Sequence, residues 1–266
     1  MRGVILAAGK GSRLNGTAGD KPKCLVEIGG ITLLERQIRA LKRAGIADVV
    51  VVVGCQAERV RAACVDAVTF VENDRFAETN SLYSLWTART LLLDGFVVLN
   101  CDVLFHPALL EALLASPHDA ALLIAYREAG QAPFGDEEMK VKVRAGQVID
   151  ISKTMEGEAD GENLGIVKFG AAAAPQLVSI VDRLIADGGT RDWAPRAFRE
   201  YAQVRPLHAI GTGGHPWIEI DFPEDYRRAV RDVLPAIEAT ERTEYTAYTT
   251  YAERAGDHGK RRSDAA

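Results

Sequence analysis

The sequence predicts a three-layer α/β/α protein, in which helices cover both faces of a mostly parallel sheet. Two observations support this prediction. Short apolar runs of strand length alternate with stretches of helical period, and some runs are continuously β-branched, as in the valines at 49–53. Strands that are buried on both faces are continuously apolar rather than alternating. The alternation of strand-like and helix-like segments is typical of βαβ units around a parallel sheet.

The first half of the chain supplies the parallel strands and the helices that connect them. The expected strands are residues 3–8, 48–53, 68–71, 96–100 and 120–125. The expected helices are residues 33–44, 57–63, 82–92 and 107–115. In the first of these helices, leucine and isoleucine share one face and basic residues the other, and Gly45 is a typical residue just beyond a helix end.

Beyond residue 126 the segments become shorter, which predicts a small and partly antiparallel extension of the sheet. Its expected strands are residues 139–143, 147–152 and 165–169, and helical pattern returns at 174–185 and 192–201. A last strand over 217–221 leads into a helix with Pro223 in its first turn, where a missing N–H does no harm.

Length and charge pattern predict one domain with a loose end. The chain has 266 residues, and we expect residues 1–240 to form a single domain. From residue 241 onward aliphatic periodicity is absent and five acidic residues balance five basic ones. We therefore expect residues 241–266 to be a flexible C-terminal tail.

Composition excludes several classes of protein. The net charge of -5 has the wrong sign for a protein that coats nucleic acid. No apolar run approaches the length of a bilayer span, so we expect a cytoplasmic protein with neither a membrane nor a nucleic-acid partner. The four cysteines form no CxxC pair, which favours buried thiols over a zinc or disulfide framework.

The first expected strand leads directly into the segment LAAGKGSRL, which predicts a phosphate-binding loop. Gly9 and Gly11 lie at the carboxyl end of a parallel strand, where open α/β sheets bind their ligands. Glycine lets backbone N–H groups approach phosphate oxygens, and Arg13, Lys21 and Lys23 add positive charge. The segment lacks the third glycine of GxGxxG and the GK[ST] of a Walker A loop, so it is neither of those motifs.

Two aspartates end expected strands, which predicts a metal site. Asp102 follows the apolar run FVVLN, and Asp221 ends WIEID. Two carboxylates at strand ends can share one Mg²⁺, which prefers a few oxygen ligands together with substrate phosphates. Taken singly, each aspartate is equally typical of a turn or a helix N-cap.

The motifs together resemble those of the nucleotidyltransferases that couple a nucleoside triphosphate to a small phosphorylated acceptor. The resemblance spans residues 1 to about 235 and is carried by LAAGKGSRL, DKPKCLVEIGG, VENDRFAETNSLYSLW, NCDVLF and WIEIDFPEDYRRA. The segment TNSLYSLW is most similar to the choline-phosphate and aminoalkylphosphonate cytidylyltransferases. The resemblance implies a GT-A-like nucleotidyltransferase fold with a Rossmann-like sheet. It also implies an Mg²⁺-dependent reaction, in which an acceptor oxygen attacks the α-phosphorus of CTP and releases pyrophosphate.

The resemblance also implies roles for individual residues. The implied catalytic residues are Arg13, Lys23, Asp102 and Asp221, of which the two aspartates would hold Mg²⁺. The implied nucleotide-binding residues are Leu6, Ala7, Ala8, Gly9, Gly11, Ser12, Arg13, Lys23, Asn80 and Ser81. The implied acceptor-binding residues are Tyr83, Trp86, Lys140, Glu162 and Trp217, where aromatic rings, together with Trp193, would attract a cationic head group.

Several of these residues have plain structural alternatives. Asn80 or Thr79 is equally typical of a cap for the helix that follows. Tyr83 and Trp86 are spaced as core residues on one helix face, and Lys140 has the pattern of a solvated lysine in an alternating strand. The acidic turns 135–138 and 160–162 offer carboxylates to an ammonium group or to sugar hydroxyls, although such turns are usually only solvated.

Two other functions remain open at this point. One is a sugar-1-phosphate nucleotidyltransferase that uses another nucleoside triphosphate, because a few loop contacts decide the choice of base. The other is a non-catalytic nucleotide-binding subunit, which would be expected to lack a metal carboxylate or the loop arginine, and this chain retains both. The sequence leaves the oligomeric state open, and a homodimer is one option.

Overall fold

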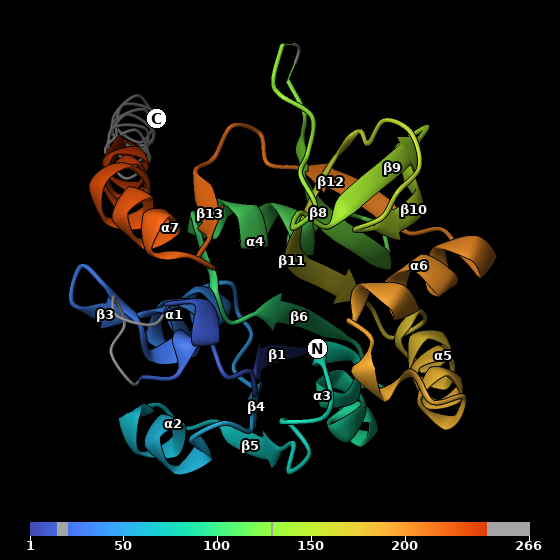
Figure 1. The fold of residues 1–266 in the computed structure, drawn as a ribbon, viewed down its shortest axis with the longest axis horizontal. Coiled ribbons are helices and arrows are strands. Elements are labelled where there is room, and N and C mark those ends of the chain that lie inside the picture. The colour runs from blue at the N-terminus through green and yellow to red at the C-terminus, as the bar shows by residue number, and fades with distance from the viewer. Residues whose placement is uncertain (15–20, 129, 244–266) are drawn as a thin grey trace, which may run out of the picture.

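The computed structural model describes residues 1–14, 21–128 and 130–243 (Figure 1). Its main sheet has nine strands in the order β5-β4-β1-β6-β11-β8-β12-β10-β9. In that order the strands are β5 (Thr69–Glu72), β4 (Val49–Val53), β1 (Arg2–Ala7), β6 (Phe96–Asn100), β11 (Gly161–Phe169), β8 (Ala120–Tyr126), β12 (His208–Gly211), β10 (Gln147–Ser152) and β9 (Lys140–Arg144). The pairing directions show that β11 and β10 run opposite to the other strands of this sheet, which all point the same way. The predicted mostly parallel sheet is therefore confirmed.

Helices cover both faces of this sheet. The α-helices in these two layers are α1 (Leu33–Arg43), α2 (Ala57–Ala63), α3 (Ser81–Thr87), α4 (Pro107–Ala115), α5 (Ala174–Ala186) and α6 (Pro195–Val204). One core cluster joins the sheet to α3, α5 and α6, and a second joins it to α1, α2 and α4. Figure 1 shows α5 and α6 on the right and α1 and α2 on the left. The three layers that the sequence predicts are thus present.

The antiparallel part of the sheet is more central than predicted. Strand β11 lies between β6 and β8 and pairs antiparallel with both, so it joins the two blocks of parallel strands. It begins at Gly161, four residues before the predicted start. Its pairing with β8 shifts register between Asn163 and Val167, and Gly165 within that shift has a φ of 74°. A bulge that requires a left-handed residue therefore interrupts the alternation on which the sequence prediction rested.

A small ribbon lies outside the main sheet. Strand β13 (Trp217–Glu219) pairs antiparallel with β7 (Val103–Phe105), and a second short pair consists of β2 (Glu27–Ile28) and β3 (Ile31–Thr32). Short 3₁₀ turns lie at Ser12–Leu14, Lys23–Leu25, Arg89–Leu91 and Gly189–Arg191. The β7–β13 ribbon packs in a third core cluster with the C-terminal helices. Asp221 therefore follows a strand of this ribbon rather than a strand of the main sheet.

The chain continues as a helix through the start of the predicted tail. Helix α7 (Pro223–Arg228) leads into a π-helical turn, Ala229–Val233, and residues 234–243 remain helical. Glu241 accepts an ion pair of 2.7 Å from Arg43 Nη1. The rest of the predicted tail, 244–266, lies outside the described residues. Within the described part of the chain, no helix combines the length and apolarity that a bilayer crossing needs.

Candidate active site

A cleft of about 340 Å³ lies where the loops that follow β1 and β6 meet the β7–β13 ribbon. Its walls combine the glycine loop, the start of α3, the turn after β6 and three segments from the antiparallel half of the sheet. Its lining includes Gly9, Gly11, Arg13, Lys23, Asn80, Ser81, Asp102, Glu137, Lys153, Trp193, Glu219 and Asp221. The two sequence motifs that predict phosphate and metal binding thus face one cavity.

The glycine loop is shaped so that Lys23 can pack beneath it. Gly11 has a φ of 61°, and a Cβ atom on Gly11 would stand 2.9 Å from Cβ of Lys23. Both the backbone conformation and the close approach therefore require glycine. Among the described residues, no atom beyond its chain neighbours lies within 4 Å of the corresponding position at Gly9, which lines the cleft. The two glycines consequently do different things, since one allows packing and the other keeps the wall clear.

Three carboxylates converge on the floor of the cleft. Asp102, Glu219 and Asp221 each offer one oxygen, and these oxygens lie within 4.8 Å of one another. The ribbon aligns them, because the N–H of Ile220 donates to the carbonyl of Asp102 at 2.9 Å. Glu219 is the last residue of β13 and Asp221 follows two positions later, so both carboxylates reach the same group. The acidic group is therefore set by β7–β13 pairing and by the end of β6.

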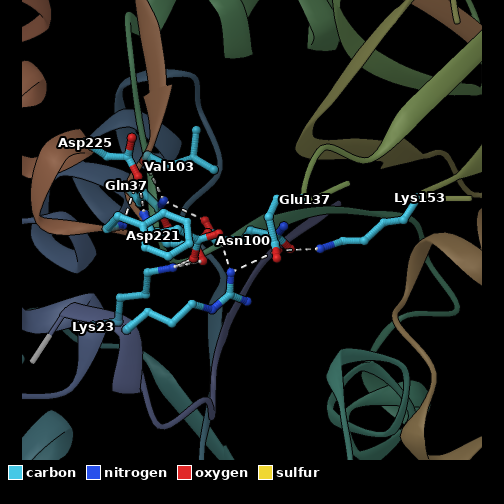
Figure 2. Close-up of polar contacts among 11 residues, drawn as sticks. Lys23, Gln37, Asn100, Val103, Glu137, Lys153, Asp221 and Asp225 are labelled. Carbon is cyan, nitrogen blue, oxygen red and sulfur yellow. Dashed lines mark hydrogen bonds and ion pairs between the residues drawn. The ribbon is translucent and has the colours of Figure 1, made fainter. Parts of the chain in front are cut away.

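Buried hydrogen bonds brace the turns on which these carboxylates lie. The Gln37 side chain of α1 is 1% exposed and donates to the carbonyls of Asn100 and Val103, at 2.8 and 2.9 Å. The Asp225 carboxylate accepts from the backbone N–H groups of Asp221 and Phe222 at 3.1 and 2.8 Å (Figure 2). Each aspartate of the cleft floor thus has a neighbour that fixes its backbone.

Lys23 lies between two of the carboxylates and sets the charge of the floor. Its Nζ donates to Oδ2 of Asp102 at 2.7 Å and also to Oδ1 of Asp221 (Figure 2). Burial disfavours the charged ammonium, but Asp102 and Asp221 outweigh that effect and raise the pKa of Lys23. Burial, followed by the charges of Asp102 and Asp221, raises the pKa of Glu219 to about 8. Without a further cation, the floor therefore holds Glu219 largely protonated at neutral pH.

The donor set fits a hard divalent cation. Oδ1 of Asp102 is buried and accepts no hydrogen bond from any residue that the structure describes. The nearby donors are carboxylate oxygens, which Mg²⁺ and similar ions prefer to nitrogen or sulfur. A buried acceptor without a donor is costly, so a cation at this position would satisfy it. The residues present thus form an acidic cluster suited to a divalent metal.

A chain of charged contacts crosses the mouth of the cleft. Arg13 Nη1 lies 3.0 Å from Oε2 of Glu137 and 3.4 Å from Oδ2 of Asp221. Lys153 Nζ lies 3.3 Å from Oε2 of Glu137 and 5.0 Å from the ring centroid of Trp193. Figure 2 shows Glu137 between Lys153 on one side and Asp221 on the other. The loop arginine is therefore connected through Glu137 to the opposite wall.

Most of the predicted nucleotide-binding residues line the cleft. Those that do are Leu6, Ala8, Gly9, Gly11, Arg13, Lys23, Asn80 and Ser81, whereas Ala7 does not. The side chain of Ser12 lies outside the described part of the structure, so its role stays a prediction. Ala7 packs instead in the core on the α1 side of the sheet. Asn80 also caps α3, which was the structural alternative to ligand binding: its side-chain oxygen accepts from the N–H of Ser81 at 2.8 Å. The hydroxyl of Ser81 accepts from the N–H of Ala194 at 2.9 Å.

The predicted acceptor-binding residues lie elsewhere: none of Tyr83, Trp86, Lys140, Glu162 and Trp217 lines the cleft. Tyr83 is buried under Arg75, and Trp86 donates from Nε1 to Asp182 at 2.8 Å, so α3 turns both rings away. Lys140 donates to the carbonyl of Lys153 at 2.6 Å. Glu162 lies on β11 beside Glu138, and burial followed by that neighbour raises its pKa to about 7. Trp217 packs against the core from β13.

Sequence reasoning missed residues that the fold brings into the cleft. Glu219 was not singled out, although the alternation of WIEID puts it on the face of Asp221 and could have revealed it. No sequence motif around Lys153 indicates that it lies at the site. Glu137 belonged to an acidic turn that the sequence analysis considered, and Trp193, which is 48% exposed, belonged to the expected aromatic wall. Of the four predicted wall aromatics, only Trp193 lines the cleft.

Comparison with known protein families identifies the fold and the enzyme class. Residues 3–200 match the profile of the MobA-like NTP transferase domain, which is more than half of the chain. The chain belongs to the MobA-like NTP transferase family. It is therefore a nucleotidyltransferase, and both the predicted family resemblance and the predicted enzyme class are confirmed.

Curated relatives of this MobA-like NTP transferase include two kinds of enzyme. The bifunctional IPC transferase and DIPP synthase of Rubrobacter xylanophilus is 30% identical over 236 residues, which are 87% of this chain and 51% of the relative. The chain thus spans about half the length of that relative. The choline-phosphate cytidylyltransferase of Streptococcus pneumoniae is 26% identical over 234 residues, which are 86% of this chain and 96% of the relative.

A solved structure shows the same fold. The inositol-1-phosphate CTP transferase from T. maritima superposes with a TM-score of 0.75 at 21% identity, over 89% of this chain and 96% of that one. The predicted GT-A-like nucleotidyltransferase fold is therefore confirmed.

Proposed function

We propose that this MobA-like NTP transferase is a cytidylyltransferase. It couples CTP to a small acceptor that carries a phosphate or phosphonate group, of the phosphocholine or 2-aminoethylphosphonate type, and releases pyrophosphate. The observation that carries the proposal is that the glycine loop and the three carboxylates face each other across one cleft. The names of the relatives support CTP as the nucleotide, since the choline-phosphate enzyme and the inositol-1-phosphate enzyme both use it.

The chemistry requires positioning more than proton transfer. An oxygen of the acceptor attacks the α-phosphorus of CTP, the new P–O bond forms, and the bond from the α-phosphorus to the pyrophosphate oxygen breaks. The attacking oxygen is already ionised, so no general base is needed. Arg13 and the loop N–H groups stabilise the charge that grows on the pyrophosphate, in the manner of an oxyanion site. Lys23 orients Asp102 and Asp221 and offers its ammonium to the phosphates.

We propose Mg²⁺ as the cofactor. Asp102, Glu219 and Asp221 would hold it, and the ion would polarise the α-phosphate and neutralise phosphate charge. The body of the protein is acidic overall, so it gains from concentrating its positive charge at one loop and from adding a divalent cation there.

The remaining sequence predictions belong to the same proposal. The domain would span residues 1–240, with the tail beyond it, and the enzyme would act in the cytoplasm, with a homodimer as one option. Acceptor binding by Tyr83, Trp86, Lys140, Glu162 and Trp217 stays a prediction. The exposed indole of Trp193 on the cleft wall is the better-placed ring for a cationic head group.

The test is release of pyrophosphate in the presence of MgCl₂. We expect release with CTP and one of phosphocholine, 2-aminoethylphosphonate or inositol 1-phosphate, and much slower release with ATP, GTP or UTP. Asp102→Asn should lower the rate by about 100-fold or more, because it removes a metal carboxylate. Asp48→Asn is the matched control, since Asp48 pairs with Arg2 away from the cleft. Release with glucose 1-phosphate and another nucleotide alone would favour a sugar-1-phosphate enzyme, and no release with any combination would sink the proposal.

A further inference from the structure

One carboxylate oxygen in the cleft forms ion pairs with two basic side chains, which come from opposite walls. Oε2 of Glu137 lies 3.0 Å from Nη1 of Arg13 and 3.3 Å from Nζ of Lys153. The same atom makes both contacts, so the two cations share a single oxygen position (Figure 2). An oxygen between a guanidinium and an ammonium is the arrangement that these groups make with a phosphate.

The three residues come from separate parts of the chain. Arg13 lies in the 3₁₀ turn after the glycine loop, Glu137 lies between β8 and β9, and Lys153 follows β10. All three line the cleft. Glu137 therefore crosses the mouth and neutralises the positive charge that the two basic residues would otherwise present to a ligand.

The contacts are of a kind that a ligand can replace. The side chains of Glu137 and Arg13 are 59% and 48% exposed, and exposed ion pairs add little to stability. Hydrogen bonding and charge from Lys153, followed by the charge of Arg13, lower the pKa of Glu137, so the carboxylate is ionised at neutral pH. A phosphate group carries more negative charge than a carboxylate and offers more oxygens. It therefore competes well for the same two cations.

We propose that Glu137 is a built-in competitor of the substrate: its Oε2 holds the position of a phosphoryl or phosphonyl oxygen between Arg13 and Lys153, and substrate binding displaces it. The proposal rests on the proposed function for the identity of the substrates. Its ligand class, an oxygen on phosphorus, is independent of the nucleobase and of the acceptor. If Glu137 instead recognised the ammonium group of an acceptor, neutralising its carboxylate would weaken the binding of that acceptor.

The test uses inorganic pyrophosphate as the probe, with MgCl₂ present and ionic strength low. Isothermal titration calorimetry would compare the full-length wild type with Glu137→Gln and Glu156→Gln. We expect Glu137→Gln to bind pyrophosphate about three- to tenfold more tightly, because an exposed competing ion pair is gone. Glu156 is exposed and lies three residues beyond Lys153 in sequence, so Glu156→Gln controls for the loss of one negative charge and should change affinity by less than about twofold.

A second comparison ties the effect to the shared oxygen. In a Lys153→Met background, Glu137→Gln should give a smaller gain than in the wild type, because one of the two released cations is absent. Thermal unfolding of the variants checks that each is folded.

The result that overturns the proposal is unchanged or weaker pyrophosphate binding by Glu137→Gln. An equal gain with Glu156→Gln overturns it too, because the effect would then be general electrostatics. Acceptor affinity that falls in Glu137→Gln assigns the carboxylate to recognition of a cationic group, which also contradicts displacement. Because pyrophosphate carries neither base nor acceptor, failure of the CTP assay leaves this test intact, and the two proposals can fail separately.

Discussion

The ammonium nitrogen of Lys23 lies 2.7 Å from Oδ2 of Asp102, although the two residues are 79 positions apart in the sequence. The lysine also bonds to Asp221, so one cation is shared by two of the three carboxylates in the cleft floor. A divalent metal held by these carboxylates would meet the same negative charge. Lys23 and such a metal would therefore be coupled through Asp102 and Asp221, and the coupling can be measured.

The first prediction concerns removal of this lysine. Lys23→Met leaves the carboxylates without their buried cation, so we expect a loss of about 2–3 kcal/mol in the free energy of unfolding in EDTA. MgCl₂ should restore part of that loss and should stabilise the variant more than the wild type. Urea unfolding with and without MgCl₂ measures both effects. Lys21→Met is the control, since Lys21 is exposed and pairs with Glu27; equal stabilisation of all three proteins by Mg²⁺ would contradict the coupling.

The second prediction separates the two glycines of the glycine loop. Gly11→Ala forces a Cβ against Lys23 at a φ of 61°, so it should lower stability by about 1–2 kcal/mol and activity with it. Gly9→Ala should leave stability unchanged, because no atom of the other described residues, chain neighbours apart, lies within 4 Å of the added Cβ. It should nevertheless raise the KM for the nucleotide, since the methyl group stands in the cleft. Thermal melts together with steady-state kinetics distinguish the two, and a Gly9→Ala enzyme with an unaltered nucleotide KM would place the phosphates elsewhere.

The third prediction separates helix capping from ligand binding at Asn80. The side-chain oxygen caps α3, so Asn80→Ala should cost about 1 kcal/mol of stability, whereas Asn80→Asp should cost much less because Asp also caps well. On the cleft wall, however, aspartate replaces an amide donor with a negative charge. We therefore expect Asn80→Asp to bind the nucleotide about tenfold more weakly despite its intact fold. Wild-type affinity in Asn80→Asp would leave Asn80 with the capping role alone.

The fourth prediction concerns the pH dependence of stability. Burial, followed by the charge of Glu138, raises the pKa of Glu162 to about 7 from an ordinary value of about 4.5. The folded protein binds this proton more tightly than the unfolded chain does. The stabilising contribution of protonated Glu162 is therefore full below about pH 4.5 and is lost as pH rises through about 7.

Glu162→Gln should remove this loss. We expect the variant and the wild type to be similarly stable near pH 4.5, and the variant to be more stable at pH 8 by up to about 3 kcal/mol. Chemical unfolding at several pH values measures the difference, with Glu158→Gln on the exposed neighbouring turn as the control. A difference that does not grow between pH 4.5 and 7 would count against the buried, protonated carboxyl group.

The sequence predicted the architecture well where hydrophobic pattern decides it. The bounds of β6, β10, α2 and α4 match the prediction, because apolar runs and helical periods are local signals. Strands β7 and β12 were not predicted; they have three and four residues, too few to show a clear alternation, and β13 and β5, which are as short, were predicted because they lie in longer apolar runs. The central position of β11 in the sheet was not predicted either. The order of strands depends on contacts between distant parts of the chain, and a bulge interrupts the alternation of β11.

At the site, backbone-anchored features were predictable and side-chain directions were not. Gly9, Gly11, Lys23, Asp102 and Asp221 meet in the cleft as expected, because strand ends and loops fix them. Tyr83 and Trp86 have the right chemistry for a cationic group, but helical spacing does not say which face of α3 meets the cleft. Lys153 and Glu137 meet Arg13 only in the folded chain, and no local sequence pattern around either residue predicts that contact.

The most direct test of the central claim is a crystal structure with CTP and Mn²⁺ in place of Mg²⁺. We predict an anomalous peak within about 2.0–2.5 Å of carboxylate oxygens of Asp102 and Asp221. The α-phosphate should adjoin the same ion, and the triphosphate should lie against Gly9 and Gly11. Binding of the ion or of the triphosphate outside this cleft would contradict the account.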